Sequence, residues 1–168
     1  PFSITTEVGE CPWSDNKLVH IGLQGKRIDK SDLPPSNLVF LLDVSGSMNN
    51  ANKLPLLKKS FSLLVDELTD QDKVSIVVYA GAAGLVLEPT KGSDGTKILG
   101  SLEKLRAGGS TAGGAGIELA YKTAQANFIK GGNNRVILAT DGDFNVGVSN
   151  RGDLVRMIQK KAKSKIFC

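Results

Sequence analysis

Three continuous apolar runs constrain the fold of this chain more than any other feature. They are Leu38–Leu42, Val74–Tyr79 and Val136–Ala139. A strand with one face in water alternates apolar and polar residues, whereas these runs contain almost no polar position. Such strands are covered on both faces, which is typical of a parallel sheet between two layers of helices. The runs therefore predict the core strands of an α/β fold.

Amphipathic segments separate these runs. Between the first two, apolar residues recur at steps of three and four positions: Leu54, Leu57, Phe61, Leu64, Val65 and Leu68. This spacing predicts a helix, and Pro55 suits its first turn. We expect a short strand or hairpin around residues 85–87, and further helices over 96–105, over 112–128 and from Leu154 onwards. The order of elements predicts a doubly wound, mostly parallel sheet flanked by helices, of the Rossmann-like kind.

The first 36 residues do not follow this alternation. Residues 11–15 predict a turn and residues 18–23 a weak strand, while Pro34 and Pro35 interrupt regular structure. We expect residues 1–36 to form a short N-terminal appendage and linker, and residues 37–168 to form the main domain. At the other end, Ile166–Cys168 resembles the start of a further strand, so we expect the main domain to be truncated at its C-terminus.

Composition argues against several classes of protein. The net charge of +4 comes largely from basic residues near the end of the chain, and no aromatic residues interleave with them to stack on bases. We therefore expect a solvated helix face there and no nucleic-acid partner. No apolar stretch reaches the roughly 18 residues that cross a bilayer, so no membrane insertion is expected. Cys11 and Cys168 suit neither a disulfide framework nor a thiolate metal site, and His20 lacks other ligands at metal-binding spacing.

Oxygen-bearing side chains follow the ends of the predicted strands. Asp43, Ser45 and Ser47 come after the first run, Asp141 after the third, and Thr111 after a glycine pair before a predicted helix. The carboxyl ends of parallel strands meet at one edge of the sheet, where ligands bind. Two carboxylates and three hydroxyls, without thiol or imidazole, suit a hard cation with six oxygen ligands. They favour Mg²⁺ or Mn²⁺ over zinc.

These five residues make the sequence resemble the von Willebrand factor type A family. That family's metal-ion-dependent adhesion site consists of Asp-x-Ser-x-Ser, a distant Thr and a distant Asp, and all five positions match. The resemblance extends from Asn37 to the end and is strongest to bacterial members with an extra segment before the domain. It implies a bound Mg²⁺, with Mn²⁺ or Ca²⁺ as alternatives, and a protein partner whose Glu or Asp completes the coordination. It also implies an adhesion or interaction role without catalysis, at the bacterial cell envelope.

Other interpretations remain open. Asp43 and the two serines would also suit the cap of a following helix, although capping leaves Asp141 unexplained. A magnesium-dependent phosphatase would place a nucleophilic Asp at position 43, but it needs a second Asp two residues later, where Ser45 stands. An accessory subunit that docks onto an ATPase or chaperone complex is the main alternative function. We expect the residues after the motif, Met48–Asn50, and those after Asp141, Asp143–Asn145, on the same rim, where they would help to select a partner. Phe144 would serve either as a contact for the partner or as a loop side chain folded back onto the core.

Overall fold

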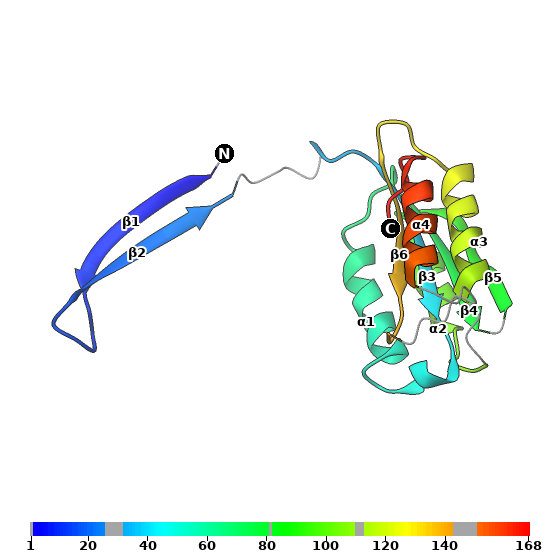
Figure 1. The fold of residues 1–168 in the computed structure, drawn as a ribbon, viewed down its shortest axis with the longest axis horizontal. Coiled ribbons are helices and arrows are strands. Elements are labelled where there is room, and N and C mark those ends of the chain that lie inside the picture. Colours follow the sequence, from blue (N-terminus) through cyan, green and yellow to red (C-terminus); the bar gives the residue numbers. More distant parts are fainter. Residues whose placement is uncertain (1, 26–31, 81, 110–112, 143–150) are drawn as a thin grey trace. The chain divides into compact units, whose positions relative to one another are not determined.

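The computed structural model describes residues 2–25, 32–80, 82–109, 113–142 and 151–168 (Figure 1). The chain divides into two compact units, residues 1–33 and residues 34–168. Within the described residues, no helix is both long and apolar enough to cross a membrane.

The first unit is an antiparallel hairpin of β1 (Ser3–Glu10) and β2 (Lys17–Gln24). The register pairs Ile4 with Leu23 and Val8 with Val19, so one face of the hairpin is apolar. The other face is polar and pairs Glu7 with His20. Sequence reasoning found the second strand but missed the first, because threonine and glutamate interrupt its apolar positions.

The second unit contains a four-stranded sheet in the order β5-β4-β3-β6. The strands β3 (Ser36–Asp43), β4 (Lys73–Ala80) and β6 (Asn133–Ala139) are parallel to one another. The edge strand β5 (Ala82–Lys91) is antiparallel to β4 and much longer than the short strand expected around residues 85–87. The predicted α/β architecture with a mostly parallel sheet is confirmed.

In the described residues, four α-helices flank this sheet, and their bounds differ from the predicted ones by a few residues. They are α1 (Leu54–Val65), α2 (Gly95–Glu103), α3 (Gly113–Ala126) and α4 (Arg151–Ala162). A short 3-10 helix, η2 (Gly46–Asn49), follows β3. Figure 1 shows α1 and α3 on opposite sides of the sheet. Where a further strand was expected to begin, at Ile166–Cys168, the structure shows a single parallel bridge between Phe167 and Arg135 of β6.

The central strand β3 divides the core into two layers. Phe40 and Leu42 pack with residues of α1 and α2, whereas Val39 and Leu41 pack with residues of α3. All four side chains are buried, as the uninterrupted apolar run predicted. The ring of Phe40 meets the ring of Phe61 edge to face, with centroids 4.5 Å apart. Burial on both faces therefore fixes the position of β3, and with it the position of the residues at the end of the strand.

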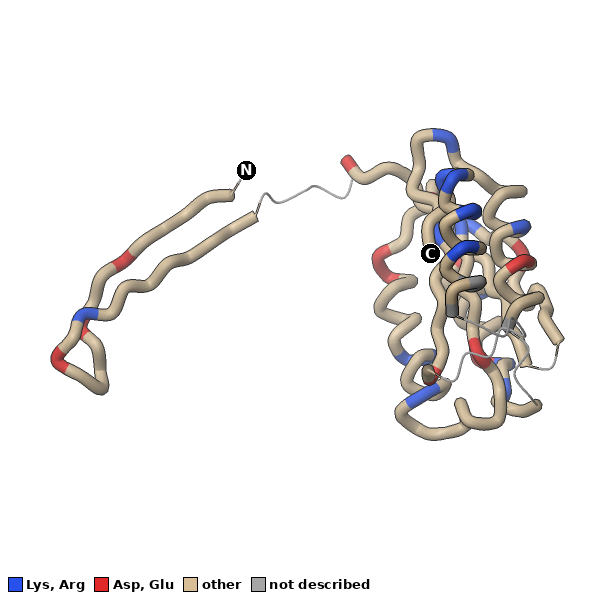
Figure 2. Tube along the Cα trace, in the orientation of Figure 1, with Lys and Arg blue, Asp and Glu red and all other residues tan. Residues whose placement is uncertain are grey.

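The basic residues near the C-terminus lie on and after α4 (Figure 2). Arg156, Lys160 and Lys163 are exposed, as expected for a solvated helix face. Lys161 instead lies beside α3, with its ammonium 5.7 Å from the centre of the Tyr121 ring.

One carboxylate joins the beginnings of β3 and β4. Asp72 accepts hydrogen bonds from the backbone N–H of Ser36 at 2.7 Å and from the backbone N–H and hydroxyl of Thr69, both at 2.8 Å. Partial burial acts to raise the pKa of Asp72, but these donors outweigh it and hold the pKa below its usual value. The ionised carboxylate therefore stabilises the folded state.

We expect Phe61→Ala to lower the free energy of unfolding by about 3–5 kcal/mol, because it leaves a cavity against Phe40 in a tightly packed core. Urea denaturation measures this change. The matched control is Leu63→Ala on the same helix, where the side chain is 72% exposed and the expected change is within about 0.5 kcal/mol. Equal effects of the two changes would contradict this account of the core.

We expect the stabilisation by Asp72 to depend on pH. Since the folded-state pKa is depressed, the contribution is present above the unfolded pKa of about 4 and is lost as the pH falls through the folded value. Asp72→Asn should therefore be less stable than the wild type at pH 7, and the difference should shrink below about pH 4. Asp70→Asn, at an exposed neighbouring carboxylate, is the control with little effect. A difference independent of pH would refute the assignment.

Candidate metal centre

Asp43 ends β3 with its side chain fully buried. One carboxylate oxygen, Oδ1, accepts a hydrogen bond from the backbone N–H of Ser45 at 2.8 Å. The other, Oδ2, accepts from the Tyr79 hydroxyl at 3.2 Å and from the Thr140 hydroxyl at 3.3 Å. A buried carboxylate is costly unless donors surround it. Here donors from β4, from the residue after β6 and from the following loop fix its orientation.

The two serines of the motif face each other. The Oγ atoms of Ser45 and Ser47 lie 3.1 Å apart, and Ser45 is buried whereas Ser47 is exposed. Ser45 occupies the N-cap of η2, yet its side chain makes no capping hydrogen bond, so the helix-capping interpretation is wrong for this residue. Adjacent oxygen ligands of an octahedral Mg²⁺ are about 3 Å apart, because each lies about 2.1 Å from the metal. The serine pair therefore fits two neighbouring coordination positions.

The loop that contains Gly108 and Gly109 is hydrogen-bonded to the loop after β3 that carries the two serines, which we call the motif loop. The backbone N–H of Gly108 donates to the carbonyl of Val44 at 2.7 Å, and the N–H of Gly46 donates to the carbonyl of Gly109 at 3.2 Å. Gly109 has a φ of 88°, which favours glycine, and its backbone passes close to Ala80. This loop leads toward Thr111, which lies outside the described residues. Asp143, Phe144 and Asn145 lie outside them as well.

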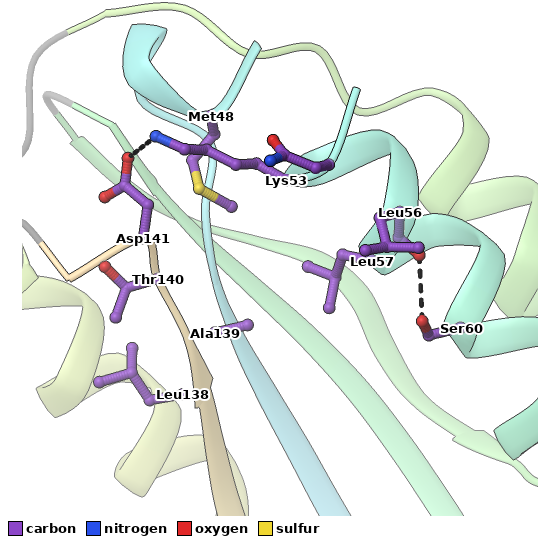
Figure 3. Close-up of a pocket in the computed structure, with 10 residues that line it drawn as sticks. Met48, Lys53, Leu56, Leu57, Ser60, Leu138, Ala139, Thr140 and Asp141 are labelled. Atoms are coloured by element: carbon purple, nitrogen blue, oxygen red, sulfur yellow. Dashed lines mark hydrogen bonds and ion pairs between the residues drawn. The ribbon is translucent and has the colours of Figure 1, made fainter. Parts of the chain in front are cut away.

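Asp141 follows the end of β6 and completes the described part of the predicted set. Its side chain is only 4% exposed, and its Oδ2 accepts a hydrogen bond from the Lys53 ammonium at 2.8 Å (Figure 3). The adjacent residue, Thr140, is bonded to Asp43. The structure therefore brings the motif after β3 and the carboxylate after β6 to one edge of the sheet, as predicted.

Three residues of this site were missed from the sequence. Tyr79 was predicted only as part of an apolar run, although its hydroxyl sits at the end of β4, on the same rim as the other groups. Burial and the neighbouring Asp43 carboxylate raise the pKa of Tyr79 well above its usual value, so the phenol remains a donor. Thr140 stands before Asp141 in the sequence, and no role was predicted for its hydroxyl. Lys53 carried no signal that set it apart from the other lysines near α1.

A cavity of about 540 Å³ opens beside the site, between α1 and the end of β6. Met48, Leu56 and Leu57 line it together with the ion pair of Lys53 and Asp141 (Figure 3). Met48, predicted on the rim, is buried at this cavity, whereas Asn49 and Asn50 are exposed.

The described residues contain no group of three or more His, Cys, Asp or Glu side chains able to hold a metal. A thiolate or imidazole site of the zinc type is thus absent from that part of the chain. A site built from two carboxylates and several hydroxyls needs no third residue of these types. The spacing of the serine hydroxyls, together with the buried carboxylates at one sheet edge, suits a hard cation.

Comparison with known proteins places the fold in a family. Residues 38–144 match the von Willebrand factor type A domain. The chain belongs to this family. The conserved hypothetical protein BatB from Bacteroides thetaiotaomicron has a similar structure, with a TM-score of 0.64 and 29% sequence identity, over 78% of this chain and 63% of that one.

Two curated relatives extend the comparison. The uncharacterised protein YfbK of Escherichia coli is 44% identical over 167 residues, which make up 99% of this chain and 29% of that protein. The magnesium-chelatase 60 kDa subunit of Rhodobacter capsulatus is 34% identical over 119 residues, 68% of this chain and 21% of that protein. This type A domain chain thus spans less than a third of the length of either relative.

We expect Tyr79→Phe to lower the free energy of unfolding by about 1–3 kcal/mol, because it removes a hydrogen bond to a buried carboxylate. Tyr121→Phe is the matched control: the Tyr121 hydroxyl is buried and has no hydrogen-bond partner in the described part of the chain. Its removal should leave stability unchanged or slightly raised. Urea denaturation of both variants measures the difference, and equal stabilities would contradict the role given to Tyr79.

Proposed function

We propose that this type A domain is a metal-ion-dependent protein-interaction module. In this proposal Asp43, Ser45, Ser47, Thr111 and Asp141 form an intact metal-ion-dependent adhesion site that holds one Mg²⁺, with Mn²⁺ or Ca²⁺ as substitutes. The observation that carries it is the pair of serine hydroxyls 3.1 Å apart beside the buried Asp43. This arrangement suits adjacent positions of a small hard cation.

The chemistry of the donors indicates what the partner contributes. The metal supplies positive charge and a coordination position toward solvent. Five protein ligands leave one position of a six-coordinate Mg²⁺ open, so the loaded site can accept a further oxygen ligand. Ser47 is exposed and marks the side open to a partner. A Glu or Asp side chain of another protein provides the hard oxygen ligand that such a cation prefers.

A second candidate function is a role as accessory subunit in a complex that contains an ATPase or chaperone. The observation that favours it is the 34% identity to a magnesium-chelatase subunit over 68% of this chain. This role requires a protein partner as well, and it is compatible with the same metal site. The two functions differ in the partner, which is a surface protein for adhesion and an enzyme subunit for the complex.

Catalysis is not part of the proposal. A phosphatase that uses Asp43 as nucleophile would need an acid or base two residues later, and Ser45 at that position instead pairs with Ser47. We therefore propose a binding role for these residues.

We expect Mg²⁺ or Mn²⁺ to raise the melting temperature of the wild type relative to EDTA. A ligand at a hundred times its dissociation constant stabilises by about 2.7 kcal/mol, which corresponds to several degrees in a domain of this size. Asp43→Asn and Ser45→Ala should abolish the shift. Differential scanning calorimetry or fluorimetry with Mg²⁺, Mn²⁺ and Ca²⁺ measures it.

Asp70→Asn is the matched control, since it removes an exposed carboxylate away from the site and should keep the full metal shift. An equal shift in Asp43→Asn and the wild type would place metal binding elsewhere. Folded wild type without a shift at millimolar metal would count against a site that forms without its partner.

A further inference from the structure

We propose that the Lys53 ammonium pairs with Asp141 when no metal is bound, and that a metal ion must displace this ammonium in order to bind. This inference rests on the proposed function and assigns a role to a residue outside the predicted ligand set. The ammonium group of Lys53 lies 2.8 Å from Oδ2 of Asp141. It thereby occupies one oxygen of a carboxylate that belongs to the proposed ligand set.

The backbone holds Lys53 at a defined place beside the site. Its N–H donates to the carbonyl of Asn50 at 2.9 Å, and its own carbonyl accepts from the N–H of Leu57 at 2.9 Å. Lys53 is the N-cap residue of α1. The side chain extends from this anchor toward Asp141, as Figure 3 shows. The backbone at the junction between the motif loop and α1 thus fixes the position from which the ammonium reaches Asp141.

The two partners of the ion pair differ in their exposure. The Asp141 side chain is 4% exposed, whereas the Lys53 side chain is 35% exposed. Removal of the positive member of a buried ion pair is destabilising, because the carboxylate then loses the charge that offsets its burial. The lysine can leave more easily, because its flexible stem borders the cavity lined by Leu56 and Leu57 and its ammonium is readily hydrated. The carboxylate is therefore the fixed member and the lysine is the exchangeable one.

A divalent cation and the Lys53 ammonium cannot both use Asp141 without strong repulsion. A metal held by this carboxylate, directly or through a water, would lie a few ångströms from the ammonium, a range at which like charges repel strongly even with partial solvent screening. Metal entry must therefore expel the lysine. The wild type must break the ion pair before it binds the metal, and this lowers its metal affinity. Removal of the lysine charge should therefore raise the affinity.

The direction of this effect separates the proposal from a purely structural role. A lysine that only supports the fold would weaken the metal site when it is replaced. If the lysine competes with the metal, its replacement would strengthen metal binding, while the metal-free protein becomes less stable because Asp141 loses its ion-pair partner. One substitution should thus change metal affinity and metal-free stability in opposite senses.

The test compares Lys53→Met, Lys53→Gln and Lys53→Arg with the wild type. Isothermal titration with Mn²⁺ and Mg²⁺ measures affinity, and thermal unfolding in EDTA measures metal-free stability. We expect Lys53→Met and Lys53→Gln to bind metal about tenfold more tightly or better, since one repelling charge is gone, and to melt at lower temperature in EDTA. Lys53→Arg keeps the charge and should bind like the wild type. Lys59→Met removes an exposed lysine charge from the same helix and should change neither quantity.

The outcomes distinguish this inference from the proposed function. Wild type that binds metal, with Lys53→Met and Lys53→Gln binding no more tightly, overturns the competition and leaves the metal site standing. Metal binding by Lys53→Met but not by the wild type supports the competition, and it means that Lys53 prevents metal binding in the wild type. Folded variants and wild type that all fail to bind metal overturn both. Should Lys53→Met fail to fold in EDTA, Lys53→Gln decides, because it replaces the ammonium with a polar donor that carries no charge.

Discussion

The buried carboxylate of Asp43 is the constraint on which the rest of the site depends. A carboxylate with no exposure at the end of the central strand requires donors on every side. Those donors come from three separate parts of the chain: the loop at Ser45, the strand end at Tyr79 and the residue after β6 at Thr140. To satisfy one carboxylate, the fold must therefore align the ends of three neighbouring parallel strands. The same alignment brings Asp141 to this edge, which makes a two-carboxylate site possible.

Charge balance at this edge connects structure with function. The donors to Asp43 are neutral, so they orient its negative charge and do not cancel it. The positive charge near Asp141 comes from Lys53, on the segment that leads into α1. A divalent cation would balance both carboxylates and free the lysine. In the proposed site, metal occupancy would thereby be linked to the junction between the motif loop and α1, which also borders the cavity beside the site.

Much of the fold could be read from patterns in the sequence. Apolar runs such as Leu38–Leu42 predicted the doubly covered strands, because burial on both faces leaves no place for polar residues. The apolar residues at steps of three and four positions predicted helix α1. The hairpin strand Ser3–Glu10 was missed because a strand with one polar face and only partial alternation is a weak signal. The length and antiparallel direction of β5 were missed too, since an edge strand is less uniformly apolar and its direction depends on its neighbour.

For the site, the sequence by itself determined the kind of chemistry: two carboxylates and several hydroxyls placed after predicted strands, with no thiol or imidazole among them. That was possible because ligand type follows from residue type, and strand ends in a parallel sheet share one edge. Only the tertiary structure decided which groups contact Asp43 and Asp141. Tyr79, Thr140 and Lys53 lie 36, 97 and 88 positions along the chain from the residues they bond. Hydrogen bonds and ion pairs across such separations depend on strand order and helix placement, which leave no local pattern in the chain.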